Sequence, residues 1–196
     1  MSRSSPMIFL AIFSIASIVS LILVVSPYVF TSQDTGALVM SASLSPTNVR
    51  GNQTVTLTIS ERNTLRYPDV LPLTDTLRSE NLSSEPCGGL FPFGIAVFEG
   101  HDNQANLSSA RPVDVFDLFG VYMCPAELVS NSFTFQPQQN VTRQASFNGY
   151  WTAGETQHPG GGVSEGVLHP FLPGEYTVLV GDEWGHTELL YFQVAP

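Results

Sequence analysis

The chain has 196 residues, with 17 acidic residues against 7 arginines and no lysine, and its formal net charge is −10 at pH 7. Without lysine the chain cannot form a phosphate-binding P-loop of the lysine type, a lysine Schiff base or a catalytic ammonium group. The acidic balance also argues against nucleic-acid binding, because such binding depends on a cationic surface that displaces counterions from phosphates.

An uncharged apolar segment, residues 7–30, stands near the start of the chain. A helix of about 20 residues crosses the hydrocarbon core of a bilayer, so this segment predicts a transmembrane helix. Arg3 precedes it and Asp34 follows it, which places the N-terminus in the cytoplasm by the positive-inside rule. A cleaved signal peptide, cut around residues 32–36, is the alternative, but signal cores usually have only about 7–15 apolar residues. We therefore predict a single-pass protein of the cell membrane with a cytoplasmic N-terminus (1–6), a signal-anchor helix (7–30), a linker (31–36) and an extracytoplasmic domain (37–196).

The two cysteines, Cys87 and Cys124, fall in the part expected outside the cytoplasm. Two cysteines in an oxidising compartment predict a disulfide. Free thiols or metal ligands are the alternative, although neither cysteine belongs to a C-x-x-C or C-x-x-H pattern. A blue-copper centre needs Cys, two His and usually Met around one cavity. The next histidine after Cys124 is His158, so the spacing argues against copper.

Four Asn-x-Ser/Thr sequons, none with a central proline, make candidate glycosylation sites. A used sequon lies on an exposed loop or strand edge. The candidate asparagines are Asn52, Asn81, Asn106 and Asn140.

Alternation of apolar and polar residues predicts the first strands of the domain. Residues 38–44 alternate, and residues 55–60 give the clearest pattern in the chain. A compact apolar run at 93–99 predicts another strand. Between these runs, residues 61–92 contain four prolines and little periodicity, which favours a long irregular excursion with a short edge strand near residues 70–73.

Further strands are predicted at residues 113–122, 133–135 and 141–150. Residues 151–170 include three consecutive glycines and are expected to form a mobile loop. Near the C-terminus, residues 175–180 and 187–194 are β-rich runs joined by a short connection with two glycines, which predicts a terminal hairpin.

The hairpin is preceded by Phe171-Leu172-Pro173-Gly174-Glu175-Tyr176. This hexapeptide resembles the L-x-P-G-x-Y pattern of the tyrosine corner in β-sandwiches of the immunoglobulin and fibronectin type III kind. The resemblance implies that the Tyr176 hydroxyl binds the backbone a few residues upstream and that Pro173 and Gly174 make the turn. Phe171 stands where the pattern usually has leucine.

We therefore predict a mainly β fold, namely a single Greek-key immunoglobulin-like β-sandwich of about seven or eight strands, preceded by one transmembrane helix. The resemblance is carried by about the last 25 residues. The domain is longer than the ~100 residues of an ordinary immunoglobulin fold, and the two cysteines do not match the usual inter-sheet pattern.

Metal ligands are present but widely spaced. No two histidines stand at a spacing that places both imidazoles on one face, so the sequence predicts no metal and no cofactor. The zinc candidates considered are His158, His169 and His186 with Glu165, Glu183 or Glu188, and the calcium candidates are Asp114, Asp117, Asp182 and Glu183.

The chain has no G-x-S-x-G or H-E-x-x-H motif and no carboxylate pair at a diagnostic spacing, so we expect a protein that is not an enzyme. Exposed aromatic residues on loops often mark recognition surfaces. Tyr150 and Trp151 open the glycine-rich loop and Trp184 lies in the hairpin connection, so these three are the partner-binding candidates. Alternatively, Trp151 belongs to the core and Trp184 covers a sheet end.

Three functional hypotheses follow. The first is a membrane-anchored extracytoplasmic domain for protein binding or cell-surface assembly. The second is an accessory subunit whose helix docks into a larger membrane complex. The third is a metal-binding exported domain.

Overall fold

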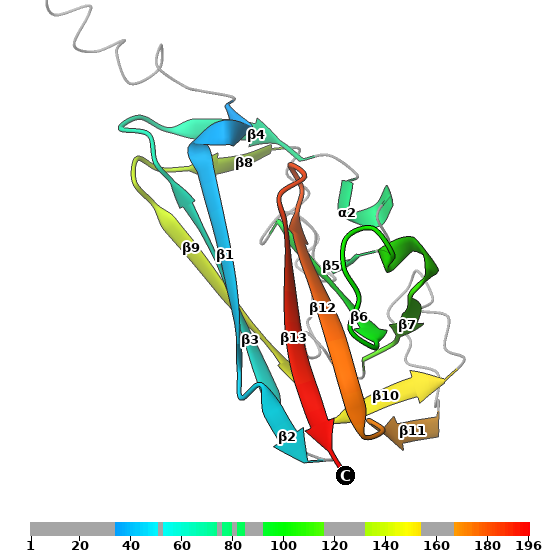
Figure 1. Ribbon diagram of the computed structural model, residues 1–196. Helices are drawn as coiled ribbons and strands as arrows, with labels where there is room; N and C mark the ends of the chain where they lie inside the picture. Colours follow the sequence, from blue (N-terminus) through cyan, green and yellow to red (C-terminus); the bar gives the residue numbers. More distant parts are fainter. Residues whose placement is uncertain are drawn as a thin grey trace, which may run out of the picture.

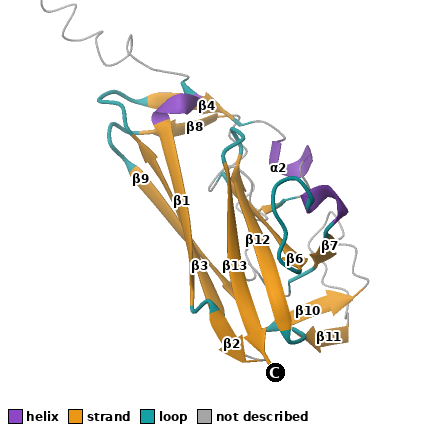
Figure 2. Cartoon of the chain, viewed as in Figure 1, coloured by secondary structure: helices purple, strands orange, loops and turns teal. Residues whose placement is uncertain are grey.

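The computed structural model describes residues 34–50, 53–73, 76–79, 82–84, 92–115, 132–153 and 167–196. In this part of the chain the fold is mainly β, as predicted (Figure 2). The described helical segments are single turns: η1 (Thr35–Ala37), α2 (Thr76–Ser79) and η2 (Leu107–Ser109). No helix among these residues is long and apolar enough to cross a membrane, and the predicted anchor at 7–30 lies outside the described residues.

The first large sheet has three antiparallel strands in the order β1-β3-β9, with bounds Leu38–Ser45, Val55–Asn63 and Asn140–Phe147. The alternation predicted for β1 and β3 is confirmed, because buried residues recur at every second position of β3. That strand extends to Asn63, three residues beyond its clearest sequence signal.

The second large sheet contains the predicted terminal hairpin, formed by β12 (Gly174–Asp182) and β13 (Thr187–Ala195). On one side of it lies β6 (Phe93–Glu99), which also pairs with the short strands β5 (Ser83–Ser84) and β7 (Arg111–Val113). On the other side β2 (Asn48–Arg50) runs parallel to β13. Only two residues separate β1 from β2, so the chain changes sheets at this point (Figure 1).

Two small sheets lie at opposite ends of the molecule (Figure 1). At the end where β1 begins, β4 (Asp69–Pro72) pairs with β8 (Ser132–Phe135). At the end that carries the C-terminus, β10 (Tyr150–Ala153) pairs with β11 (Val167–Pro170). We call these the β4–β8 end and the β10–β11 end.

A single apolar core lies between the two large sheets. Its buried side chains come from β3 and β9 on one side and from β6, β12 and β13 on the other. Phe147 is fully buried, and its ring centroid lies 5.9 Å from that of Phe192 across the core. A smaller cluster of Leu38, Leu71 and Phe135 closes the β4–β8 end.

Several strand boundaries differ from the prediction. Thirteen strands occur among the described residues, rather than seven or eight, because several have only two to four residues. The strand predicted at 141–150 is two strands, β9 and β10, separated at Gly149, whose φ of 78° is a conformation that glycine adopts readily. The edge strand predicted near 70–73 is confirmed as β4. The strand predicted at 113–122 overlaps β7 (Arg111–Val113) only at Val113, and Val115 forms an isolated bridge with Trp151. Residues 116–122 lie outside the described residues.

The hydrogen bond expected of Tyr176 is present. Its hydroxyl donates to the Leu172 carbonyl oxygen at 2.9 Å, and its ring packs edge-on against Phe171 at 4.8 Å. Burial raises the pKa of the Tyr176 hydroxyl.

We expect Tyr176→Phe to lower the free energy of unfolding by about 0.5–1.5 kcal/mol, because it deletes one partly buried hydrogen bond and leaves the packing intact. Thermal unfolding of the full chain in detergent measures this effect. Tyr67→Phe, at an exposed tyrosine, is the control and should change stability little. Equal unfolding midpoints for Tyr176→Phe and wild type would show that the packing of the ring, and not the hydroxyl hydrogen bond, contributes to stability.

Candidate functional site

Two buried carboxyl groups and a histidine meet at the β4–β8 end of the core. Glu61 comes from β3, Asp182 ends β12, and His186 immediately precedes β13. One ligand atom from each lies within 4.8 Å of the other two. The side chains of Glu61 and Asp182 are fully buried, whereas that of His186 is 32% exposed. The group is therefore closed on the core side and reaches solvent through His186.

Strand periodicity places both acids inside. Side chains in a strand alternate between faces, so Glu61 shares the inward face of Leu57 and Ile59. Asp182 shares the inward face of Val178 and Val180.

The connection between β12 and β13 fixes Asp182 and His186 relative to each other. One carboxylate oxygen of Asp182, Oδ1, accepts hydrogen bonds from the backbone N–H groups of Trp184 and His186, each at 2.8 Å. The backbone N–H of Asp182 donates to the His186 carbonyl at 3.1 Å. Gly185 has a φ of 91°, which lets the chain turn back into β13.

The second oxygen of Asp182, Oδ2, makes a short contact with His186 Nδ1. His186 Nδ1 also approaches Glu61 Oε1 at 3.9 Å, beyond hydrogen-bond range. Neither oxygen of Glu61 accepts a hydrogen bond, although both are buried. A buried carboxylate without donors is costly, so Glu61 must either carry a proton or face a cation.

In the absence of a cation, Glu61 carries the proton. Burial, followed by its contact with the Asp182 carboxylate, raises the pKa of Glu61 from an ordinary 4.5 to about 10. As a neutral acid Glu61 keeps its proton and donates a hydrogen bond to the Asp182 carboxylate, which pairs in turn with His186.

This shift predicts a pH dependence of stability in chelator-treated protein. Between about pH 4.5 and 10 the folded chain holds a proton that the unfolded chain releases, so this contribution to stability is complete below pH 4.5 and decreases as the pH rises. Glu61→Gln cannot ionise, so we expect its unfolding free energy to rise relative to that of wild type by roughly 1.4 kcal/mol per pH unit between pH 4.5 and 8. Thermal unfolding at pH 4.5 and 8 measures the difference. A difference that does not change between the two pH values would contradict the raised pKa.

Other polar groups crowd this end of the molecule. The buried Asn63 side chain donates to the carbonyls of Tyr67, Phe135 and Gln136, and its oxygen accepts from the Leu65 N–H. These bonds tie the segment after β3 to β8. Asp69, at the start of β4, is also buried here, so this end of the core holds several buried polar groups beside Glu61.

Trp184 covers this end of the molecule. Its indole N–H donates to the Pro72 carbonyl at 2.9 Å, and its ring packs edge-on against Phe135 at 5.5 Å. This position agrees with the alternative interpretation of the sequence, in which Trp184 covers the end of a sheet.

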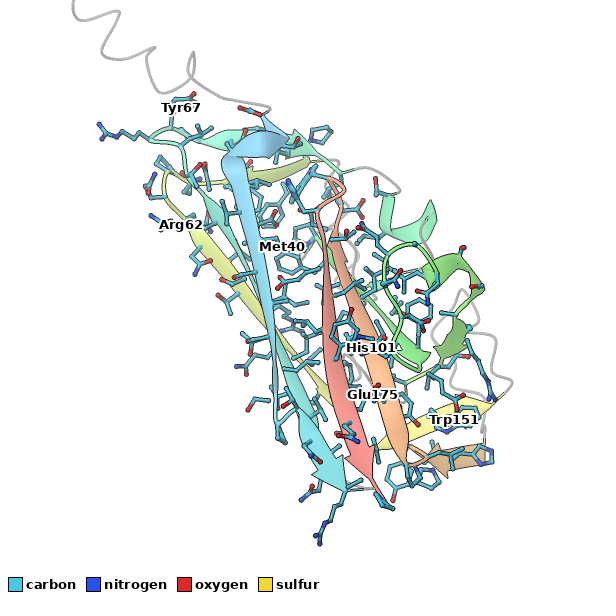
Figure 3. The ribbon with its side chains drawn as sticks, in the orientation of Figure 1. Met40, Arg62, Tyr67, His101, Trp151 and Glu175 are labelled. Carbon is cyan, nitrogen blue, oxygen red and sulfur yellow. The ribbon has the colours of Figure 1, made fainter. Side chains whose placement is uncertain are left out.

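Trp151 lies at the opposite end of the molecule (Figure 3). Its half-buried ring packs against the core and lies 5.0 Å from the His169 ring. The nine residues of β12 separate the two ends, a span of about 30 Å. The structure therefore does not bring Trp184 together with Tyr150 and Trp151.

The same separation divides the histidine candidates. His169 lies on β11 beside Trp151, and His186 lies at the β4–β8 end, so these two cannot share a metal ion. Glu188, considered as a zinc ligand, accepts a hydrogen bond from the Ala42 N–H at 2.7 Å. Among the calcium candidates, Asp182 is buried and Asp114 is exposed after β7. His158, Glu165 and Asp117 lie outside the described residues.

Asn106 and Asn140 are exposed, as a glycosylation site requires. Asn140 starts β9, and its side-chain oxygen accepts from the Ser60 hydroxyl at 2.6 Å. The remaining candidates, Asn52, Asn81, Cys87 and Cys124, lie outside the described residues.

Sequence reasoning missed Glu61, although a signal was present. The inward register of Val55, Leu57 and Ile59 continues to residue 61, where it predicts a carboxylate facing the core. Such a residue has no place in an apolar core without a partner, and this identifies it as a candidate.

Comparison with known proteins identifies no family. No protein-family model matches the chain, and no curated protein matches it. The chain is similar to a beta-glucosidase from Listeria innocua in complex with glucose, at 12% identity and a TM-score of 0.39. It is also similar to a beta-glucosidase from Erythrobacter marinus, at 10% identity and a TM-score of 0.41.

Both alignments cover 81% of this chain but only 16% and 15% of the two enzymes. The chain thus spans a small fraction of their length. TM-scores of 0.39 and 0.41 are too low to carry an argument about fold or activity.

Proposed function

We propose that this protein is a membrane-anchored, extracytoplasmic binding module that is not an enzyme and that contacts a protein partner through its β10–β11 end. The fold we propose for it is an immunoglobulin-like Greek-key β-sandwich, held to the cell membrane by the helix predicted at residues 7–30.

Two features support the immunoglobulin-like assignment. Two sheets face each other across one core, and the first strand passes from one sheet to the other between β1 and β2. The hydrogen bond from the Tyr176 hydroxyl to Leu172 has the form of a tyrosine corner.

The position of the anchor sets the orientation. Residue 34, four residues after the predicted helix, leads into η1 and β1 at the β4–β8 end (Figure 1). That end then lies nearest to the membrane. The β10–β11 end faces away from it, where a partner outside the cell can approach.

The observation that carries the proposal is a group of exposed apolar side chains at the β10–β11 end. Leu168 is 45% exposed and Leu172 is 57% exposed. Tyr150 pairs with Pro170 across β10 and β11, so its side chain lies on the same outer face of this strand pair as Leu168. Trp151 faces the other way and packs the strand pair against the core. Exposed apolar residues beside an aromatic one are typical of a contact surface.

The test uses charge substitutions at exposed positions, which leave the core untouched. We expect Leu168→Asp and Leu172→Asp each to release the partner that co-purifies with the detergent-extracted full chain. Val39→Asp is the matched control, because Val39 is 54% exposed but lies at the β4–β8 end. All three variants should unfold at the wild-type temperature.

Replacing residues 154–166 by a short Gly-Ser bridge tests the glycine-rich segment of the sequence in the same assay, and we expect it too to reduce partner recovery. An unchanged partner list in all of the β10–β11 variants would overturn the proposed surface. Exchanging residues 7–30 for an unrelated membrane helix tests the accessory-subunit alternative, since loss of the partner in that chimera alone would favour docking through the helix.

A further inference from the structure

We propose that Glu61, Asp182 and His186 bind a divalent first-row metal ion, best matched by zinc, at the β4–β8 end of the core. The ligand atoms are Glu61 Oε1, Asp182 Oδ2 and His186 Nδ1. This site is independent of the partner surface at the opposite end.

The side chain of Glu61 is the feature that points to a cation. It is completely buried, neither of its oxygens accepts a hydrogen bond from a donor group, and Oε1 faces His186 Nδ1 at 3.9 Å. Its other close neighbour is a second acid, Asp182. Buried carboxylates in proteins are paired or coordinate metals. Arg62, the neighbour of Glu61, cannot compensate it, because that exposed side chain lies on the outer face and binds Gln138.

The charges of the group favour a divalent ion. Two ionised carboxylates contribute two negative charges, and the chain has no lysine to balance them. A divalent cation neutralises both, and His186 then coordinates through an unprotonated Nδ1. The hydrogen bonds from two backbone N–H groups to Asp182 Oδ1 hold the carboxylate in orientation, as outer-sphere partners do in metal sites. They leave Oδ2 beside His186 Nδ1, and the ion would take the place of the proton between these two atoms.

The donor set and its dimensions select the metal. Two carboxylate oxygens and one imidazole nitrogen suit zinc and its neighbours, whereas calcium and magnesium prefer oxygen ligands alone. Zinc binds oxygen and nitrogen at about 2.0–2.2 Å, which sets tetrahedral ligand atoms about 3.5 Å apart. The three atoms already lie within 4.8 Å of one another, so small side-chain movements suffice. The exposed side of His186 admits the ion and leaves a fourth position for water.

Trp184 provides an optical reporter, because its backbone N–H bonds Asp182 and its ring covers the same end. Trp151, at the far end, is replaced by phenylalanine so that Trp184 is the single tryptophan. The full chain, purified in detergent without a histidine tag and treated with chelator, is titrated with zinc, and the bound metal is counted by elemental analysis. We expect one zinc per chain and a saturable change in Trp184 emission.

Glu61→Gln and His186→Gln should each weaken zinc binding at least about tenfold, since even outer-sphere changes cost that much. His101→Gln is the matched control: His101 is exposed and pairs with Glu175 at 3.8 Å, away from the site (Figure 3). It should bind zinc as wild type does, and calcium should bind to none of the chains in the micromolar range.

Thermal unfolding shows whether each variant is folded. If Glu61→Gln does not fold, the zinc affinity of His186→Gln tests the proposal instead, because His186 is partly exposed and its substitution disturbs the core less. Absence of zinc binding by folded wild type at about 100 µM would overturn the proposal. Protonation of Glu61 would then be what relieves the repulsion between its carboxyl group and that of Asp182. Wild-type affinity in both site variants would also overturn it, because the zinc would then bind elsewhere.

Discussion

Phe147→Ala is expected to lower the free energy of unfolding by about 3–5 kcal/mol, the largest loss we predict for this chain. Phe147 ends β9 and is fully buried between the two large sheets. Its ring stacks near Phe192, which itself packs against Tyr176 at 5.1 Å. Truncation removes the buried ring and leaves a cavity that strands on both sides hold open, because their hydrogen-bonded ladders resist collapse.

Denaturant titration of the full chain in detergent, followed by circular dichroism, measures this loss. Phe147→Leu is the matched control and should cost much less, about 1.5 kcal/mol, since it retains most of the apolar volume. Phe133→Ala, at a half-buried position of the smaller cluster, should fall between wild type and Phe147→Ala. Similar losses for alanine at 147 and at 133 would contradict a single core centred between the large sheets.

The importance of Phe147 could be predicted from its sequence only in part. The run containing it predicts a strand, but nothing in the run says which strand it faces. Alternation is a local property and reliably marks inward positions such as Val55, Leu57 and Ile59. Pairing is a long-range property: β3 pairs with β9, 78 to 92 residues away, and β6 pairs with β12 across a similar distance.

Backbone conformation explains the boundaries that the sequence did not predict. Residues 141–150 look like one strand because their apolar content is continuous. A glycine at 149 with a positive φ bends the chain there, so that β10 leaves the sheet of β9 and pairs with β11 instead. The parallel pairing of β2 with β13 was also missed, because a three-residue strand has too few positions to show alternation.

The candidate site also combines a local contact, which the sequence can suggest, with a long-range contact, which it cannot. Asp182 and His186 are close in sequence, and a turn of this kind places them together. Glu61 joins them from a strand of the other sheet, and only the folded register reveals that contact. Sequence reasoning placed Trp184 on the terminal hairpin correctly but could not tell that the opposite end of the molecule carries Trp151, because that depends on strand length and direction.

Asp182→Ala should produce the second-largest loss, about 2–4 kcal/mol in chelator-treated protein. The substitution removes the acceptor of two backbone N–H groups, those of Trp184 and His186, and each partly buried donor left unsatisfied costs about 1–3 kcal/mol. Without these bonds the connection between β12 and β13 loses its fixed shape. Relief of the contact between the carboxyl groups of Asp182 and Glu61 offsets part of the cost.

Asp182→Asn separates the hydrogen bonds from the charge. The amide oxygen of asparagine accepts the same two backbone N–H groups, so we expect this variant to retain most of the stability that alanine loses. Thermal unfolding of the full chain compares the two, and Trp184 emission reports whether the connection is intact. If asparagine destabilised the protein as much as alanine, the negative charge of Asp182 beside His186, and not its hydrogen bonds to the backbone, would be what holds β12 and β13 together at this end.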